Sequence, residues 1–570
     1  MKNIIATFSL CCMFAAAVQA QQSLPHWIRQ GSASQLVVSD KPMLLLGGEL
    51  GNSSASSFGD VERIFPKLQR AGLNTVLVPA YWDLIEAEEG KFDFSFVDKA
   101  IEQARQNELK IVFLWFGAWK NSMSCYTPLW FKQDYKQYPR CMTQAGKPLE
   151  IASPFSEEVF RADSRAFTAL MKHLAEIDGK EHTVIMVQVE NEIGMLEDAR
   201  DYSKEANRLF NAPVPENLTK YLKQNRKALH PWMLKKWEEA GAKTTGTWQE
   251  VFGSDIYTDE IFMAWHFASY VERMIQAGRA VYDLPMYVNA AMNSRNRKPG
   301  EYPSAGPLAH LIDVWHCAAP SIDLLAPDLY DKGFTDWTAQ YKLHNNPLFI
   351  PEIRLEPNDG VRAFYVFGEH DGVGFSPFSI EDMPDSPDYP LAKSYAKLRE
   401  LMPLITKYQG KGQMHGLLFD QQNRERVLTW GNTSLVCRHF FTLPWDARAT
   451  DGSTWCEGGG LVIRLAEDEY IVAGSGIVIE FKAPGEMAVK ADRKLGEDGF
   501  VAAGGMNVQK ETWNGSERVG IGTVDEVKVN PDGTLAYIRR LNGDQTHQGR
   551  HVRIGVDDFS VLHVKLYRYK

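Results

Sequence analysis

Basic charge and long apolar runs are both scarce in this chain of 570 residues. Its 62 Lys and Arg residues are outnumbered by 72 Asp and Glu residues, and the formal net charge of −10 argues against nucleic acid as a partner. Beyond the N-terminal segment, no apolar run reaches the roughly 18 to 20 residues that span a bilayer. The sequence therefore predicts no membrane span.

Cysteine is also rare, and only five of the seven cysteines lie beyond residue 20. An odd number allows at most two disulfides. The separations along the chain favour disulfides between Cys125 and Cys141 and between Cys437 and Cys456, which leaves Cys317 as a buried thiol. Spacing alone does not fix the connectivity. No spacing of cysteine and histidine matches a zinc site, so no metal is predicted.

The first twenty residues have the pattern of a secretory signal peptide. Lys2 is followed by an apolar run from Ile4 to Val18, and Val18 and Ala20 provide the small residues of a cleavage site. We expect cleavage after Ala20 and a secreted or periplasmic protein.

Residues 21–400 alternate short apolar strands with amphipathic helices, which is typical of a parallel α/β fold. Eight strands are predicted, and a (β/α)8 TIM barrel is the natural interpretation. The predicted strands are Met43 to Gly48, Thr75 to Pro79, Lys110 to Phe116, Thr183 to Val189, Met286 to Ala290, Ile322 to Ala326, Pro347 to Ile350 and Ala363 to Phe367.

Two other regions differ from this alternation. Residues 196–258 are rich in charge and tryptophan, and they indicate a helical insertion over the barrel mouth. Residues 401–570 consist of short alternating runs separated by glycines, which predicts an all-β, sandwich-like domain. A helix between Asp382 and Leu401 is expected to link the domains, and the lack of a low-complexity linker predicts that they pack together.

Glutamates follow two of the predicted strands. The strand at 183–189 ends in Glu190, Asn191 and Glu192, and the strand at 347–350 is followed by Glu352. The carboxyl ends of barrel strands form the mouth where catalytic groups lie. Two carboxyl groups about 5 to 5.5 Å apart are what retaining glycoside hydrolysis requires. The spacing therefore predicts a glycosidase pair, Glu192 and Glu352.

Residues 188–194 (Gln-Val-Glu-Asn-Glu-Ile-Gly) resemble the acid/base motif of glycoside hydrolase family 35, the β-galactosidases. Residues 47–49, 72–76 and 82–86 are also similar to that family, and residues 458–463 and 540–550 resemble a β-domain of unknown function found in a bacterial group of its members. The resemblance implies Glu192 as acid/base, Glu352 as nucleophile, Asn191 on the 2-hydroxyl of the sugar, Glu190 as a supporting acid and Glu49 in the substrate pocket.

The third-strand region departs from the family pattern. Asn121 occupies the position of a glutamate that contacts galactose in the family, so Asn121 is the expected substrate contact here. Tyr330, which follows the sixth predicted strand and Asp328, is placed to hydrogen-bond the nucleophile or to pack in the core. Trp82 and Trp115 are candidates for stacking on a sugar face, although tryptophan is equally a core residue.

These observations predict a secreted, retaining, exo-acting β-galactosidase that removes terminal galactose from plant cell-wall oligosaccharides and polysaccharides. Carbohydrate is the predicted partner. No cofactor is predicted, because side chains fill both catalytic roles. The alternatives are a β-glycosidase for arabinopyranose, fucose or glucose, and a non-catalytic glycan-binding protein on the same barrel.

Overall fold

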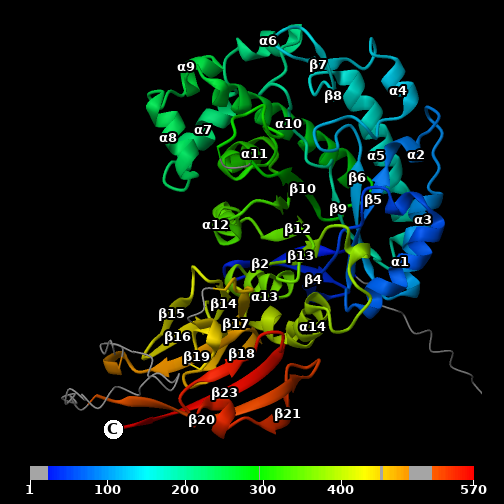
Figure 1. Cartoon of the computed structure of the whole chain (residues 1–570). Coiled ribbons are helices and arrows are strands. Elements are labelled where there is room, and N and C mark those ends of the chain that lie inside the picture. Colours follow the sequence, from blue (N-terminus) through cyan, green and yellow to red (C-terminus); the bar gives the residue numbers. More distant parts are fainter. Residues whose placement is uncertain (1–22, 294–295, 444, 450–452, 487–515) are drawn as a thin grey trace, which may run out of the picture.

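The computed structural model describes residues 23–293, 296–443, 445–449, 453–486 and 516–570. Figure 1 shows an α/β domain above a β domain, with the chain passing from one to the other near residue 400. The predicted signal peptide lies outside the described residues.

Eight parallel strands form the sheet of the α/β domain. In spatial order they are β4 (Leu45–Leu46), β13 (Gly374–Pro377), β12 (Phe349–Ile353), β11 (Leu324–Leu329), β10 (Met286–Ala291), β9 (Val184–Gln188), β6 (Lys110–Phe116) and β5 (Thr75–Tyr81). The edges meet where the Leu77 N–H donates to the Gly48 carbonyl at 2.9 Å and the Leu50 N–H donates to the Leu77 carbonyl at 3.0 Å. The sheet is thus closed into a barrel, and the predicted TIM-barrel fold is confirmed.

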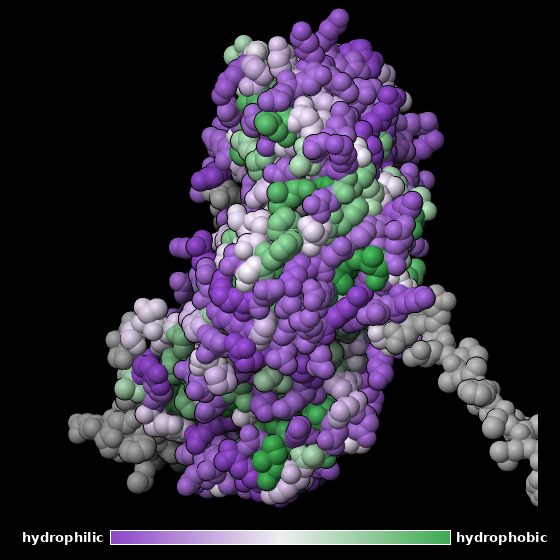
Figure 2. Space-filling view, turned by 90° about the vertical axis from the view of Figure 1, so that its right-hand side faces the viewer, coloured by the Kyte–Doolittle hydropathy of each residue, from purple (hydrophilic) through white to green (hydrophobic). Residues whose placement is uncertain are grey.

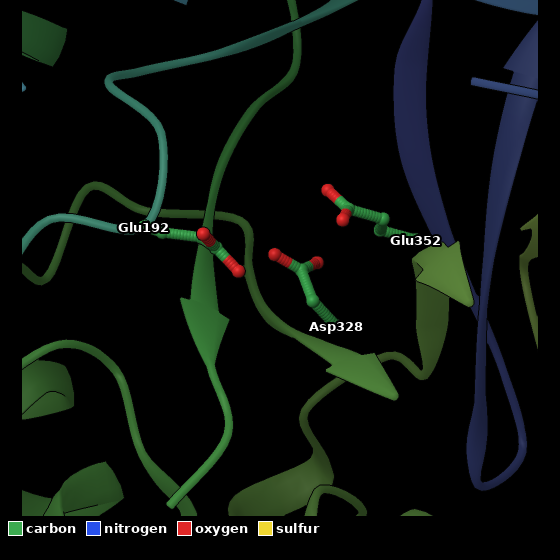
Figure 3. Close-up of side chains that lie close together, drawn as sticks. All are labelled: Glu192, Asp328 and Glu352. Carbon is green, nitrogen blue, oxygen red and sulfur yellow. The ribbon is translucent and has the colours of Figure 1, made fainter. Parts of the chain in front are cut away.

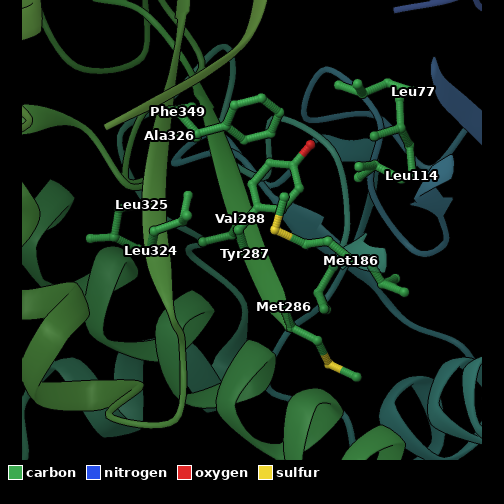
Figure 4. Close-up of a cluster of buried hydrophobic side chains, with 14 of the residues drawn as sticks. Leu77, Leu114, Met186, Met286, Tyr287, Val288, Leu324, Leu325, Ala326 and Phe349 are labelled. Atoms are coloured by element: carbon green, nitrogen blue, oxygen red, sulfur yellow. The ribbon is translucent and has the colours of Figure 1, made fainter. Parts of the chain in front are cut away.

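Side chains fill the barrel interior and leave no pore. Figure 4 shows part of this core, in which the Tyr287 ring lies edge-on to Phe349 with their centroids 5.3 Å apart. Met186, Leu77 and Leu114 from neighbouring strands are fully buried in the same cluster. Tight packing of this kind fixes the strand ends that carry the polar residues described below.

Eight of the helices among the described residues surround the barrel. They are α1 (Phe58–Arg70), α3 (Ser95–Gln106), α5 (Glu157–Asp178), α10 (Ile256–Arg279), α11 (Ile312–Ala318), α12 (Phe334–Gln340), α13 (Asp359–Glu369) and α14 (Pro390–Tyr408). In α1, Val61, Ile64, Phe65 and Leu68 are buried at helical spacing. Gly72 follows the helix with φ +86°, a left-handed conformation that favours glycine.

Shorter elements complete this domain. An N-terminal antiparallel sheet consists of β1 (His26–Gln30), β2 (Ala33–Val38) and β3 (Lys41–Met43), and the connection after β6 holds α4 (Leu129–Gln133), β7 (Arg140–Met142) and β8 (Pro148–Ala152). Residues 196–258 hold α6 (Lys204–Phe210), α7 (Glu216–Gln224), α8 (Pro231–Glu239) and α9 (Trp248–Phe252), at the top of Figure 1.

The eighth strand differs from the prediction. Residues 363–367 lie inside α13, and β13 at Gly374–Pro377 takes the place of the predicted strand. The helix is buried on nearly all sides, because the barrel covers one face and the β domain the other. The apolar run at 363–367 is only five residues long, and a run this short does not distinguish helix from strand. The first predicted strand is likewise divided between β3 and β4.

The β domain consists of two antiparallel sheets. One has the order β14 (Met414–Phe419), β17 (Gly458–Ala466), β18 (Glu469–Ser475), β23 (Ser560–Tyr569), β20 (Arg518–Val529) and β21 (Leu535–Arg540). The other has the order β15 (Glu425–Trp430), β16 (Thr433–His439), β19 (Ile477–Lys482) and β22 (Val552–Ile554). Leu417, Val472 and Ile479 belong to the apolar core that the two sheets enclose. The predicted all-β domain is confirmed.

Helix α13 joins the two domains. It packs on β14 and β17, and Leu461 and Ile463 of β17 belong to the same apolar cluster as the barrel. Gly368 permits this approach, because a Cβ there would lie 2.7 Å from the Leu461 Cβ and 2.9 Å from the Gly416 Cα. Arg362 of α13 donates to both carboxylate oxygens of Glu457, at 2.7 and 2.9 Å. The domains form one packed unit.

The surface and the thiols complete the description. The face in Figure 2 is mostly hydrophilic, with hydrophobic residues in separate small patches. Among the described residues, no helix combines the length and apolar character needed to cross a bilayer. All five cysteines beyond residue 22 are free, so both predicted disulfide pairings are wrong. Cys141 and Cys437 are buried, whereas Cys125 and Cys456 are exposed.

The close approach at α13 gives a prediction for stability. Gly368→Ala should lower the free energy of unfolding by about 1–3 kcal/mol, because the added methyl group forces β14 and β17 away from the helix. The matched control is Gly59→Ala in α1, where the nearest atom to a new Cβ is 4.0 Å away. That variant should be neutral or more stable by about 0.5–1 kcal/mol. Urea denaturation followed by fluorescence would compare them, and equal midpoints would contradict the described packing.

Candidate active site

Three carboxyl groups converge at one end of the barrel. Glu192 follows β9, Asp328 belongs to β11 and Glu352 belongs to β12. Each contributes an oxygen, and these oxygens lie within 4.8 Å of one another. Figure 3 shows Asp328 between the other two carboxyl groups. Asp328 and Glu352 are register partners on adjacent strands, so the barrel itself fixes their proximity.

Hydrogen bonds from two neighbouring segments hold Glu192 in place. Its backbone N–H donates to the Asn289 Oδ1 on β10 at 2.9 Å, and the Asn121 side-chain amide donates to its carboxylate. The Ser122 N–H donates to the Glu192 carbonyl at 3.1 Å. Glu192 and Asn121 have φ values of +45° and +50°, which non-glycine residues seldom adopt. Such strained residues are concentrated at functional sites.

The environment of Glu192 makes it an acid at neutral pH. Burial and then the negative charge of Glu352 raise the pKa of its carboxyl to about 7. The Lys120 ammonium and a hydrogen bond with Asp328 act in the opposite direction. A carboxyl group with this pKa can both donate and accept a proton near neutrality.

Glu352 lies opposite and is held by Tyr330. The Tyr330 hydroxyl donates to Oε1 of Glu352, while Oε2 has no hydrogen-bond partner among the described residues. Arg354 does not pair with Glu352; it lies 3.9 Å from Glu356, with its guanidinium 5.6 Å from the centre of the Tyr330 ring. The Glu352 side chain lines the cavity described below, where a substrate can reach it.

Asp328 is a site residue for which the sequence alone predicted no role. It is fully buried, and Asn289 Nδ2 donates to its Oδ2 at 2.6 Å. Burial, followed by the charges of Glu352, Glu192 and Glu49, raises its pKa well above the usual range. Asn289 thus links Asp328 to the backbone of Glu192, a connection that sequence analysis missed. Its one signal was an asparagine near the end of an otherwise apolar strand.

Glu49 and Asn191 carry buried polar atoms that lack partners. Among the described residues, neither Glu49 oxygen and neither atom of the Asn191 carboxamide has a hydrogen-bond partner of ordinary geometry. Burial first, and then the charge of Glu352, raises the pKa of Glu49 well above the usual range. A buried polar group left unpaired costs about 1–3 kcal/mol. Neither residue is among those that line the cavity described below.

Glu190 belongs to a second layer behind the site. Its Oε2 accepts a hydrogen bond from the Trp119 N–H at 2.9 Å. Burial and the adjacent Asp163 raise the pKa of Glu190 well above the usual range. Asp163 in turn accepts from Trp115 Nε1 at 2.9 Å and from the Tyr270 hydroxyl at 2.8 Å.

The structure does not place Trp82 and Trp115 at the barrel mouth, and the prediction of sugar stacking is wrong for both. Each is fully buried. Trp82 donates to the Glu86 carboxylate at 2.8 Å and Trp115 donates to Asp163. They are core residues with satisfied indole N–H groups, and tryptophan content alone could not reveal this.

A cavity of about 400 Å³ opens over the carboxyl groups. Glu192, Glu352, Asn121, Lys120 and Tyr330 all line it. Lys120 is buried and was not predicted. Pro303, from the connection after β10, also lines the cavity, whereas no described lining residue comes from the insertion at 196–258.

The three carboxyl groups also have the oxygen chemistry that suits Mg²⁺ or Ca²⁺. The raised pKa values of Asp328 and Glu192 mean that protons offset part of the negative charge, and Lys120 offsets more. Two carboxyl groups facing each other across a cavity, one acidic near neutrality, are what glycoside hydrolysis requires.

Comparison with protein-family models found two matches. Residues 57–262 match the glycoside hydrolase family 42 model, described as beta-galactosidase. Residues 391–553 match a domain of unknown function, DUF5597. The family 42 segment includes Glu192 but ends before Glu352. The predicted family 35 is therefore wrong, while the predicted β-galactosidase class and the C-terminal domain of unknown function agree with the matches.

Solved structures with a similar fold include three beta-galactosidases. Those from Marinomonas, Halorubrum lacusprofundi and Rahnella are 13%, 14% and 14% identical, with TM-scores of 0.42, 0.41 and 0.42. The alignments cover 63%, 62% and 65% of this chain and 60%, 58% and 57% of theirs. This chain thus spans less than two thirds of their length. No curated protein matches it in sequence.

Proposed function

We propose that this protein is a retaining, exo-acting β-galactosidase. The observation that carries the proposal is the placement of Glu192 and Glu352 on facing strand ends, with one carboxylate oxygen of each within 4.8 Å of the other. So close an approach favours the pair of carboxyl groups of a retaining enzyme over the roughly 6.5–9.5 Å separation of an inverting one. The match of residues 57–262 to a beta-galactosidase family model supports the class.

The first step forms a covalent galactosyl-enzyme. Glu192, whose pKa of about 7 keeps it largely protonated below neutrality, gives its proton to the glycosidic oxygen as the bond to the anomeric carbon breaks. A carboxylate oxygen of Glu352 attacks that carbon from the opposite face. The leaving sugar departs with a new hydroxyl group, and Glu192 is left ionised.

The second step releases galactose. Ionised Glu192 takes a proton from a water molecule, whose oxygen attacks the anomeric carbon as the ester bond to Glu352 breaks. The anomeric configuration is retained, and both carboxyl groups return to their starting state. The hydrogen bond with Asp328 stabilises the ionised form of Glu192 between the two steps.

Polar groups at the cavity wall suit recognition of a single sugar ring. Lys120 and Asn121 line the cavity, whereas the unpaired polar atoms of Glu49 and Asn191 are buried outside its lining. The side-chain NH₂ group of Asn121 donates a hydrogen bond to Glu192. The predicted contact of Asn121 with the sugar is therefore left to its side-chain carbonyl oxygen. This favours a second candidate, a β-glycosidase for arabinopyranose, fucose or glucose.

The proposal extends to location and natural substrate. The N-terminal pattern of Lys2 followed by the apolar run to Val18 supports export, and we infer a secreted or periplasmic enzyme. An exported galactosidase with a narrow cavity fits removal of terminal galactose from plant cell-wall oligosaccharides and polysaccharides.

Hydrolysis of nitrophenyl β-galactoside tests the proposal. Glu192→Gln should lower kcat/KM by about 10²- to 10⁴-fold on a β-galactosyl disaccharide, whose leaving sugar needs the proton of a positioned acid. Glu352→Gln should abolish turnover, because an amide cannot form the covalent intermediate. The matched control is Glu216→Gln, which changes an exposed side chain of α7 and should keep full activity. If the wild-type protein hydrolyses only another nitrophenyl glycoside, it is a β-glycosidase for a sugar other than galactose. If it hydrolyses no glycoside, a glycan-binding protein is indicated.

The pH dependence gives a separate prediction. Glu192 must hold its proton to act as an acid, so kcat/KM should fall as pH rises through about 7. Lys120→Met removes a cation that lowers the pKa of Glu192, so this basic limb should move to higher pH. Lys147→Met, on the exposed surface, is the control and should leave the limb in place. A shift to lower pH in Lys120→Met would contradict the electrostatic account.

A further inference from the structure

A groove of about 950 Å³ runs between the barrel and the β domain. The barrel contributes residues 329–336, after β11, together with the end of β12. The β domain contributes the turn at 418–423, between β14 and β15, and residues 454–457. Small-molecule sites usually occupy roughly 300–1,000 Å³, so the groove holds a larger ligand than the catalytic cavity does.

The groove continues from the catalytic cavity. Tyr330 and Asp331 line both. The Tyr330 hydroxyl donates to Glu352, while the side chain as a whole is 38% exposed. A chain leaving the catalytic cavity past Tyr330 therefore enters the space between the two domains.

The turn of the β domain presents side-chain amides to this space. The Asp420 carboxylate accepts the backbone N–H groups of Gln422 and Asn423 at 2.7 and 2.6 Å, which fixes the turn. The side-chain amides of Gln421 and Gln422 have no hydrogen-bond partner among the described residues. Each offers both donors and an acceptor, as sugar hydroxyl groups require. Lys332 extends the polar lining on the barrel side.

The charge of the groove indicates which sugars fit. Five acidic and three basic side chains line it, so it does not attract acidic sugars. The bidentate pair of Arg362 with Glu457 joins the two walls across the domain boundary. Phe334, half-buried beneath Arg362 at 5.6 Å, adds an aromatic surface of the kind that sugar rings contact.

We propose that this groove binds an uncharged oligosaccharide on the leaving-group side of the galactosidic bond, so that the β domain takes part in substrate selection. The proposal rests on the proposed function, because it assigns the groove to the part of the substrate beyond the bond that Glu192 and Glu352 cleave. No covalent step occurs in the groove itself.

The test compares substrates of different length. The wild-type enzyme should cleave at least one plant cell-wall oligosaccharide, of three or more neutral sugars with a terminal β-galactose, with a higher kcat/KM than the disaccharide that has the same terminal linkage. The double variant Gln421→Ala/Gln422→Ala should lose about tenfold, or about 1.4 kcal/mol, on that oligosaccharide and keep its activity on the nitrophenyl substrate. Lys332→Ala, on the opposite wall, should show the same selective loss.

The matched control is Gln545→Ala/Gln548→Ala, two exposed glutamines of the same domain outside the groove, which should change neither activity. A wild-type enzyme without preference for any oligosaccharide, or variants that lose both activities equally, would overturn the groove proposal alone. A wild-type protein inactive on every galactoside would instead overturn the proposed function on which it rests.

Discussion

Closure of the barrel brings Glu192, Asp328 and Glu352 to one buried point, and much of the site follows from this crowding of like charges. Burial and mutual repulsion make simultaneous ionisation costly, so protons are retained near neutral pH. Asn289 holds both Asp328 and the backbone of Glu192, while Tyr330 holds Glu352. The carboxyl groups are thus fixed close together, and the raised pKa of Glu192 lets it hold a proton near neutrality, as an acid must.

The same barrel is tied to the β domain through the helix between its seventh and eighth strands. Helix α13 follows the strand that carries Glu352 and packs directly on β14 and β17. The turn between β14 and β15 borders the groove that opens from the catalytic cavity. The helix that follows the Glu352 strand therefore packs directly on the strand that leads into this turn, which holds the second domain beside the catalytic cavity.

Much of this arrangement could be predicted from the sequence. The strand at Lys110–Phe116 was predicted with its observed bounds, and strand-end acids indicated Glu192 and Glu352 because parallel strands end at a common face. Residues 363–367 could not be assigned correctly, since an apolar run of five residues fits a buried strand as well as a turn of a buried helix. Single polar residues such as Asn289 and Lys120 belong to no sequence pattern, so their place in the site could not be predicted. The burial of Trp82 and Trp115 depends on packing that only the fold determines.

The central claim is that Glu352 becomes covalently bonded to the sugar. A galactosyl fluoride with fluorine in place of the 2-hydroxyl lacks hydrogen bonds that strengthen in the transition state, so the intermediate should accumulate. Mass spectrometry of the tryptic peptide spanning residues 343–354 should then show one added fluorogalactosyl group on Glu352. Labelling of Asp328 or Glu49 instead, or rapid turnover of galactosides with inverted anomeric configuration and no labelled peptide, would contradict the account.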